Sequence, residues 1–285
     1  MNNNHKVSII TYHYVRDLKF SRYPQIKGLD LAVFKEQIEY FARNYHFITM
    51  ELLIDAIENS NSLPDNSVLL TFDDAYIDHY LFVFPILNEK GIQGSFFPPV
   101  KAITEHTLLD VNKIHFILAS ETNKSKILSQ IFAELAKYRK DFNLNSDQSY
   151  FEKLAKSSRF DTAEVIFIKR LLQVELEEPV RKIITNNLFE KFVGISEESF
   201  SRELYMDIDQ LKCMKRNGMH IGSHGYDHYW FGSLPKEKQA NEIVKSLEFL
   251  RAIDCDMQNW TMSYPYGNYN SDTIELLNPI YALEI

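Results

Sequence analysis

Two adjacent carboxylates, Asp73 and Asp74, follow an apolar, β-rich run at residues 67–72. Two ionised carboxylates leaving a buried strand are unfavourable in a dry pocket unless a cation lies beside them. One of them can then bind a metal ion while its neighbour acts as general base on water. The alternative is that one of them only caps the helix that begins nearby. The pair is therefore a candidate for catalysis or for a helix cap.

Two imidazoles, His224 and His228, form the second candidate group in the segment HGYDH. Their i, i+4 spacing puts both rings on one face of a helical turn and suits one divalent ion. Gly225 disfavours a regular helix and favours a turn after the strand, which can also bring the rings together. No Glu follows His224, which excludes the HExxH protease pattern. The alternative is two surface histidines.

Two histidines and one carboxylate make an open three-ligand site that leaves a position for water, as catalytic zinc sites do. The second carboxylate is then free to act as a base. The chemistry still needs an acid for the leaving group and a donor for the developing oxyanion. His13 can be the acid, although a lone histidine at a strand end is more often a hydrogen-bonded core residue. The backbone N–H of Tyr266, in the turn after Pro265, can be the donor.

These groups all lie at the ends of expected strands. Apolar, β-branched runs predict strands at residues 7–12, 46–50, 67–72, 92–97, 219–224 and 261–264. Helical periodicity predicts helices at 31–44, at 78–90 with an end at Gly91, and at 235–252. Alternating strands and helices predict parallel strands with crossover helices, in a barrel or an open sheet. In a barrel, chemistry takes place at the carboxyl ends of the strands.

The sequence pattern changes after residue 102, where helix-breaking residues become rare. No glycine lies between Gly94 and Gly194, and Pro179 is the only proline in residues 100–200. Apolar stripes at 125–140, 162–176 and 179–193 have helical spacing. The pattern predicts a helical insertion over residues 103–200. Its charges are mixed in sign, which favours solvated outer faces over a partner-binding surface.

Composition excludes several classes of protein. The 285 residues are 45% hydrophobic and 25% charged, as in ordinary globular chains. Lys and Arg number 31 against 39 Asp and Glu, so the net charge of −8 disfavours nucleic acid as a partner. Cys213 and Cys255 are expected to be free thiols. No run of apolar residues is long enough for a membrane span, and the start of the chain does not resemble a leader, so we expect a cytoplasmic protein.

With these residues in view, the sequence resembles the polysaccharide deacetylase family, also called carbohydrate esterase family four or the NodB-homology family, over residues 5–102 and 205–285. TFDDAYIDHYLFVFPIL is similar to the TFDDG-type motif, and SHGYDH is similar to H-[ST]-x-x-H. The resemblance implies that Asp73 is the catalytic base and that Asp74, His224 and His228 bind the metal ion. Ala75 stands where glycine is usual, and Gly225 stands where Ser or Thr is usual.

SYPYG is similar to the third family motif, R-x-P-Y, which implies that Tyr266 supplies the oxyanion N–H. Ser263 occupies the arginine position, so the usual partner of the base aspartate is absent or supplied elsewhere. The late histidine motif of the family has no match. TYHYV resembles the permuted branch typified by poly-N-acetylglucosamine deacetylases, in which that histidine precedes the TFDD strand, and this implies that His13 is the acid.

The resemblance implies a distorted (β/α) barrel with fewer than eight regular strands in residues 1–102 and 201–285, with the helical insertion between them. It also implies a divalent metal ion, with zinc as the first choice, and a carbohydrate substrate. The expected reaction removes an acyl group, N-acetyl first, from a sugar of a surface glycan or its precursor. The alternatives are a carbohydrate-binding pseudoenzyme and a metal-dependent phosphoester hydrolase, but no cationic phosphate contacts stand near these motifs.

Overall fold

The computed structural model describes residues 6–278 and separates into two compact units. The first unit comprises Met1–Asp17, Gly28–Thr107 and Ser201–Ile285, and the second comprises Leu18–Lys27 and Leu108–Phe200. All the candidate site residues belong to the first unit. The assignment of residues 103–200 as an insertion into a deacetylase-like barrel stays a prediction.

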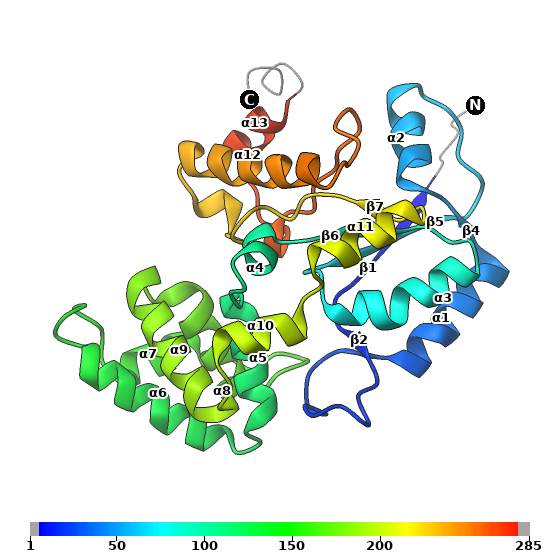
Figure 1. Ribbon diagram of the computed structural model, residues 1–285. Helices are drawn as coiled ribbons and strands as arrows, with labels where there is room; N and C mark the ends of the chain where they lie inside the picture. Colours follow the sequence, from blue (N-terminus) through cyan, green and yellow to red (C-terminus); the bar gives the residue numbers. More distant parts are fainter. Residues whose placement is uncertain (1–5, 279–285) are drawn as a thin grey trace. The chain divides into compact units, whose positions relative to one another are not determined.

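A parallel sheet forms the centre of the first unit (Figure 1). Its strands are β1 (Val7–Tyr12), β4 (His46–Phe47), β5 (Ser67–Asp73), β6 (Gly94–Phe97) and β7 (His220–Ile221). The order is β1-β5-β6-β7, and β4 also pairs with β5. Strands β2 (Val15–Arg16) and β3 (Leu29–Asp30) form a separate parallel pair. Every residue of β5 is buried, as a strand with neighbours on both edges and helices on its faces requires.

The register of the strands brings their carboxyl ends to one edge of the sheet. Tyr12 pairs with Phe72, and Asp73 pairs with Phe97. Beyond β7, Gly222 donates its N–H to the Phe96 carbonyl at 2.9 Å, and Ser223 forms a parallel bridge with Met262. The chain therefore delivers His13, Asp73–Asp74, His224 and Ser263 to the same end, as expected for a parallel α/β fold.

The predicted fold class, an α/β fold arranged as a distorted (β/α) barrel with fewer than eight regular strands, is confirmed by the parallel sheet and the helices around it, and no closed barrel forms among residues 6–278. Four predicted strands are shorter than expected. Those at 92–97 and 219–224 are reduced to Gly94–Phe97 and His220–Ile221. The strand at 46–50 ends at Phe47, because Thr49 accepts a hydrogen bond from the Leu52 N–H and so caps helix α2 (Met50–Glu58). The strand at 261–264 is reduced to the single bridge at Met262.

Helices cover the sheet of the first unit. They are α1 (Leu31–Asn44), α2, the π-helix His79–Val83, α3 (Phe84–Glu89), α4 (Val100–Thr104), α11 (Ile208–Arg216), α12 (Lys236–Ala252) and α13 (Ser271–Leu277), with 3-10 turns at Phe231–Ser233 and Pro265–Gly267. The predicted helix at 78–90 begins as a π-turn. Its Phe84 N–H bonds to the His79 carbonyl, and Pro85 has no N–H with which to continue an α-helical ladder across that point.

Stacked aromatic rings lie beneath the carboxyl end of β5. Phe72 stacks on Tyr12, with ring centroids 5.1 Å apart, and on Phe96 at 4.7 Å. Phe34 from α1 meets Tyr12 edge to face at 5.3 Å. Phe34, Phe72 and Phe96 are fully buried. This packing fixes the strand that carries Asp73, since aromatic pairs add about 0.5–1.5 kcal/mol each to the free energy gained by burial.

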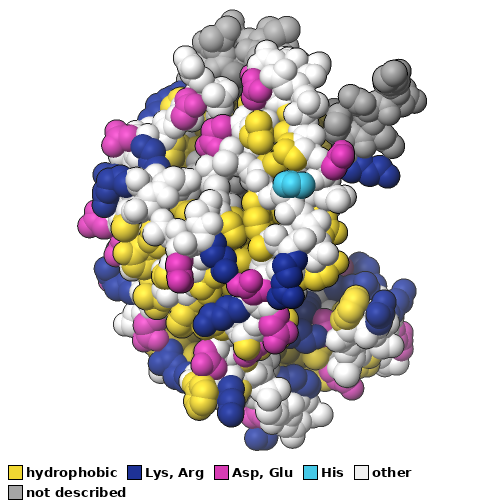
Figure 2. Space-filling view, turned by 90° about the vertical axis from the view of Figure 1, so that its right-hand side faces the viewer, with side chains coloured by type: hydrophobic (Ala, Val, Ile, Leu, Met, Phe, Trp, Pro, Cys, Tyr) yellow, Lys and Arg dark blue, Asp and Glu magenta, His cyan; other side chains and the backbone are white. Residues whose placement is uncertain are grey.

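The second unit is helical, and no strand lies among its described residues (Figure 1). Its helices are α5 (Asp110–Ser120), α6 (Lys124–Tyr138), α7 (Asp147–Leu154), α8 (Ala163–Arg170), the π-helix Leu171–Glu175, α9 (Glu178–Val193) and the first half of α10 (Glu197–Leu204). Across residues 6–278, no helix combines the length and apolarity needed to cross a bilayer. Figure 2 shows Lys and Arg side chains mixed with Asp and Glu over one face of the molecule.

Candidate metal centre and catalytic site

The turn after β5 holds Asp74 in a backbone conformation that few residues adopt. Asp74 has φ 72° and Ala75 has φ 52°, in the left-handed region that costs a residue with a Cβ about 1–2 kcal/mol. The Asp74 N–H donates to the Phe97 carbonyl at 3.1 Å, and the Met206 N–H donates to the Ala75 carbonyl at 2.8 Å. These bonds hold the turn, so Ala75 takes a conformation that suits the glycine usual at this position.

The segment from His224 to His228 is a turn and not a helix. Gly225 has φ 74° and His228 has φ 56°. The turn still brings the two imidazoles together, with ring centroids 4.8 Å apart. The backbone conformation therefore explains why glycine stands at position 225, because glycine adopts the left-handed region without strain.

Glu242, on α12, anchors this histidine loop. Its Oε2 accepts hydrogen bonds from the Tyr226 N–H at 3.0 Å and the Asp227 N–H at 2.7 Å. On the other side, the Lys101 ammonium at the start of α4 contacts the Asp227 carboxylate at 2.5 Å. Burial raises the pKa of Glu242 above the usual range. Sequence reasoning missed Glu242, because an acidic residue inside a predicted helix carries no signal of a partner elsewhere in the chain.

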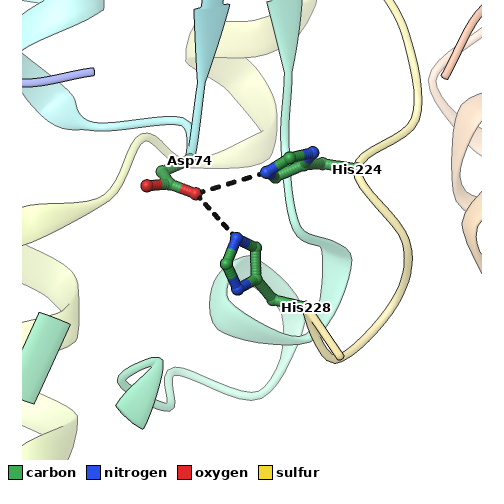
Figure 3. Close-up of side chains that lie close together, drawn as sticks. All are labelled: Asp74, His224 and His228. Atoms are coloured by element: carbon green, nitrogen blue, oxygen red, sulfur yellow. Dashed lines mark ion pairs between the residues drawn. The ribbon is translucent and has the colours of Figure 1, made fainter. Parts of the chain in front are cut away.

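Asp74, His224 and His228 converge on one point (Figure 3). The Asp74 Oδ1 lies 3.5 Å from the His224 Nε2 and 3.3 Å from the His228 Nε2, and the three residues are 3%, 2% and 8% exposed. Two ligands bound tetrahedrally at 2.0–2.1 Å to one zinc ion are about 3.3 Å apart. The spacing of these atoms therefore suits a divalent cation between them.

The hydrogen bonds around the three residues also fit a cation. The Asp74 Oδ1 is buried and has no hydrogen-bond partner within residues 6–278, whereas its Oδ2 accepts from the Tyr76 hydroxyl at 2.7 Å. The His224 Nδ1 donates to the Ser263 carbonyl at 2.7 Å, which turns its Nε2 toward Asp74. Metal-binding histidines and carboxylates are commonly oriented by such outer bonds. A buried acceptor without a donor is rare in proteins, and a bound cation would satisfy it.

The electrostatics of the three residues favour positive charge between them. Burial opposes the ionisation of Asp74, but its contacts with the His224 and His228 imidazoles hold its pKa well below the usual range. Burial also opposes charge on both histidines. It lowers the pKa of His228, whereas the two neighbouring carboxylates raise the pKa of His224. Asp74 is therefore ionised, and its Oδ1, which faces the two imidazole nitrogens without a hydrogen-bond partner in the described chain, attracts a cation.

Asp73 has different surroundings from its neighbour. Burial raises its pKa above the usual range, and the Asp74 carboxylate adds to the rise, while His224, His13 and Ser263 oppose it. The Ser263 hydroxyl donates to the Asp73 Oδ2 at 3.1 Å, whereas the Oδ1 is buried and has no hydrogen-bond partner in the described chain. Ser263 thus bonds to the aspartate that the family arginine would orient, with one neutral hydrogen bond in place of a charged one.

His13 follows directly after β1, at the register position next to Asp73. Its side chain is exposed, and its charge is close enough to Asp73 to lower the pKa of that carboxyl. The His13 carbonyl accepts a hydrogen bond from the buried His79 Nε2 at 2.7 Å. His79 therefore supports the backbone that carries the candidate acid, and burial lowers its own pKa to about 4.

Tyr266 lies beside the histidine pair, with φ 60°. Its ring meets the His228 ring edge to face at 4.7 Å and stacks on Trp230 at 4.1 Å with an interplanar angle of 5°. Tyr266 is 37% exposed. The structure thus places an aromatic pair next to the candidate metal ligands. Tyr226, in the histidine loop, bonds through its hydroxyl to Glu105 and packs against the core.

The comparisons with known proteins agree with the sequence resemblance. Residues 187–280 match the family model described as polysaccharide deacetylase, which covers both histidines and the SYPYG motif. Asp73, Asp74 and His13 lie outside the matched segment, so their place in the site depends on the geometry given above. Among curated protein sequences, none matches the chain significantly.

Two solved structures share the fold. A Streptococcus pyogenes deacetylase, PplD, solved in complex with acetate, is 17% identical with a TM-score of 0.53, and the alignment covers 95% of this chain and 78% of that one. IcaB from Ammonifex degensii is 18% identical with a TM-score of 0.51, covering 96% of this chain and 80% of that one. At these sequence identities, the similarity to the two structures concerns the fold alone. The similarity in sequence to polysaccharide deacetylases comes from the family model matched by residues 187–280.

Proposed function

From its resemblance to polysaccharide deacetylases in sequence and fold, we propose that this chain is a metal-dependent hydrolase that removes an acyl group, N-acetyl first, from a sugar of a surface glycan or its precursor. One observation carries the proposal. The buried Asp74 Oδ1 has no hydrogen-bond partner within residues 6–278 and faces two imidazole nitrogens at 3.3 and 3.5 Å, with a second carboxylate as its neighbour. A cation and a general base are the two requirements of hydrolysis by activated water.

In this proposal, Asp74, His224 and His228 hold the cation, with zinc as the first choice for two imidazoles and one carboxylate. When bound, a divalent cation supplies Lewis acidity that strengthens water as an acid and polarises the acyl carbonyl. The Tyr76 hydroxyl and the Ser263 carbonyl orient Asp74 and His224 for this role.

The remaining groups move protons and stabilise charge. Asp73 takes a proton from the attacking water as the new C–O bond forms at the acyl carbon. The Tyr266 N–H then stabilises the negative charge that develops on the carbonyl oxygen. When the C–N bond breaks, His13 gives a proton to the leaving nitrogen, so that the products are a carboxylate and a free amine. His13 suits this task because it is exposed beside Asp73 and can receive substrate from solvent.

Two observations support a sugar as the carrier of the acyl group. The Tyr266 ring meets His228 and stacks on Trp230, and flat aromatic faces suit the apolar faces of sugar rings. The Streptococcus pyogenes deacetylase was solved with acetate, which is the product that we propose here.

The departures from the family motifs do not favour a pseudoenzyme. Ala75 and Gly225 both occupy the left-handed backbone conformation that their turns require. Ser263 keeps a hydrogen bond to the proposed base at 3.1 Å. Each substitution therefore keeps a structural function at the site, although the Ser263 hydroxyl gives weaker support to Asp73 than a guanidinium would.

The test is acetate release from N-acetylated sugars, sugar oligomers and nucleotide sugars by the purified chain. We expect release that a strong chelator abolishes and that added zinc restores. Binding of the sugars without release, with zinc present, would contradict the proposal and favour a carbohydrate-binding pseudoenzyme. Release that is indifferent to the chelator would contradict the metal dependence alone.

A further inference from the structure

The helical unit contains a cavity of about 180 Å³ that the proposed reaction does not use. All of its lining residues belong to the second unit. Three of the lining side chains end in an ammonium group: Lys27, Lys124 and Lys169. Asp161 provides the only carboxylate among the lining residues. The chain as a whole has a net charge of −8, so this excess of positive charge is a local feature.

Asp161 neutralises only part of that charge. Its Oδ1 contacts the Lys27 ammonium, and its Oδ2 accepts from Lys169 at 2.8 Å. Both carboxylate oxygens therefore already have a lysine partner. One negative charge is shared by two positive charges, which leaves an excess of about one charge at this wall of the cavity.

Lys124 contributes a second positive charge, which the Glu121 carboxylate compensates only in part because it also pairs with Lys126. Its ammonium donates to two neutral acceptors, the carbonyl oxygens of Leu118 and Glu121, each at 2.5 Å. The Glu121 carboxylate itself accepts from the Lys126 ammonium at 3.2 Å and from the Asn123 N–H at 2.8 Å. Lys124 is half-buried, and this burial lowers its pKa. A half-buried ammonium that donates hydrogen bonds only to neutral acceptors gains from an anion in the adjacent space.

The three ammonium groups also have more N–H donors than the described residues provide acceptors for. Five of their nine N–H groups have an acceptor among the described residues. The other four need water or a ligand. An acceptor with several oxygens and about two negative charges would match both the surplus of donors and the surplus of charge.

We propose that this cavity binds a phosphate group, either as the free ion or as a phosphomonoester of a sugar. Phosphate carries about −1.5 to −2 charges near neutral pH and presents several acceptor oxygens. Lysine is a common phosphate ligand, as a point charge with three donors. Leu118 and Val165 supply apolar surface in the same cavity, which can contact the carbon atoms of an ester.

The experiment is isothermal titration of the full chain at low ionic strength with inorganic phosphate, glucosamine 6-phosphate and acetate. We expect one saturable site per chain for a phosphate ligand and much weaker binding of acetate, which has one charge and two oxygens. Tighter binding of the ester than of inorganic phosphate identifies a sugar phosphate as the ligand, and the reverse identifies the free ion. Absence of saturable binding of both phosphate ligands overturns the proposal.

Lys124→Gln should weaken phosphate binding about tenfold or more, because it removes a hydrogen bond from a charged donor. The matched control is Lys126→Gln, which lies on the same helix with a largely exposed side chain and does not line the cavity. Equal affinities of wild type and Lys124→Gln would overturn the proposal. If Lys124→Gln does not fold, the melting temperature of the wild type decides: phosphate must raise it more than sodium chloride of equal ionic strength.

The site is independent of the proposed deacetylation. Asp74→Ala, with its altered metal centre, should bind phosphate as tightly as the wild type. Loss of phosphate binding in Asp74→Ala would assign the phosphate to the metal centre and overturn the proposal, whereas failure of acetate release would leave the phosphate result unchanged.

Discussion

The two sides of the candidate site are built differently. On one side, Asp74, His224 and His228 are at most 8% exposed, and the Tyr76 hydroxyl and the Ser263 carbonyl hold two of them by hydrogen bonds of 2.7 Å. On the other side, His13 is exposed and Tyr266 is 37% exposed. The buried side has fixed side chains and a carboxylate oxygen that faces two imidazole nitrogens, and both suit a bound ion. The exposed side can meet a large substrate.

Asp73 lies between the two sides, and replacing it should abolish the reaction without affecting binding of the cation. In Asp73→Asn the amide cannot take a proton from water, so we expect turnover to fall about 10⁴-fold, the upper range for a general base. The zinc content should stay that of the wild type, because the three proposed ligands remain. Acetate release and elemental analysis of the same preparation measure both. Turnover within tenfold of the wild type would show that Asp73 is not the base.

His13 tests the exposed side. His13→Ala removes the proposed proton donor, and we expect kcat to fall about 10²–10³-fold with zinc content unchanged. Ester substrates should lose less than amides, because an alkoxide leaves with less need for a proton than an amine does. Equal kcat on an amide substrate for variant and wild type would remove His13 from the mechanism.

His79 supports the exposed side from within the core, and its effect on stability depends on pH. Its pKa is about 4 in the fold and about 6.5 in an unfolded chain. Below pH 6.5 the unfolded chain therefore binds a proton that the folded chain does not, and the free energy of unfolding falls as the pH falls. Between pH 7 and pH 5 this loss amounts to about 2 kcal/mol.

His79→Gln keeps a donor for the His13 carbonyl but does not titrate. Urea unfolding at pH 7 and pH 5 should therefore show a pH dependence flatter than that of the wild type by about 2 kcal/mol. The same loss of stability between the two pH values in both proteins would show that His79 is not the source.

Tyr76 tests how firmly the buried side is held. Tyr76→Phe removes the hydrogen bond to the Asp74 Oδ2 but keeps the ring that stacks on Tyr14 at 4.0 Å. We expect about tenfold weaker zinc affinity, in the lower range for such outer partners. Competition with a chromophoric chelator measures it. Tyr14→Phe, which leaves the Tyr76 hydroxyl in place, should match the wild type, and a wild-type affinity in Tyr76→Phe would argue against this support.

Much of the site was predictable because its residues stand in short motifs at strand ends. The run at 67–72 followed by Asp73 and Asp74 predicts a buried strand with acidic groups at its carboxyl end, and the structure has both. The parallel fold then explains why His224 and His228, about 150 residues away in the sequence, reach Asp74. The cytoplasmic location and the lack of a nucleic-acid partner stay predictions from the sequence.

Other features could not be predicted because they depend on contacts between distant segments. The hydroxyl of Ser263 bonds to Asp73 across 190 positions of sequence, and Glu242 holds the histidine loop from a helix whose pattern indicates only its buried face. The end of the strand at Phe47 depends on the Thr49 cap, a local signal that competed with an apolar run. Backbone strain at Asp74 and Ala75 is also invisible without the turn that imposes it.

The most direct test of the account is the zinc stoichiometry of Asp74→Ala, measured by equilibrium dialysis against the wild type. The account predicts one tightly bound zinc ion per wild-type chain and none in Asp74→Ala, while Asp73→Asn, altered at the adjacent residue, retains one. A full equivalent of zinc bound to Asp74→Ala with wild-type affinity would contradict the assignment of this carboxylate and both histidines as the metal centre.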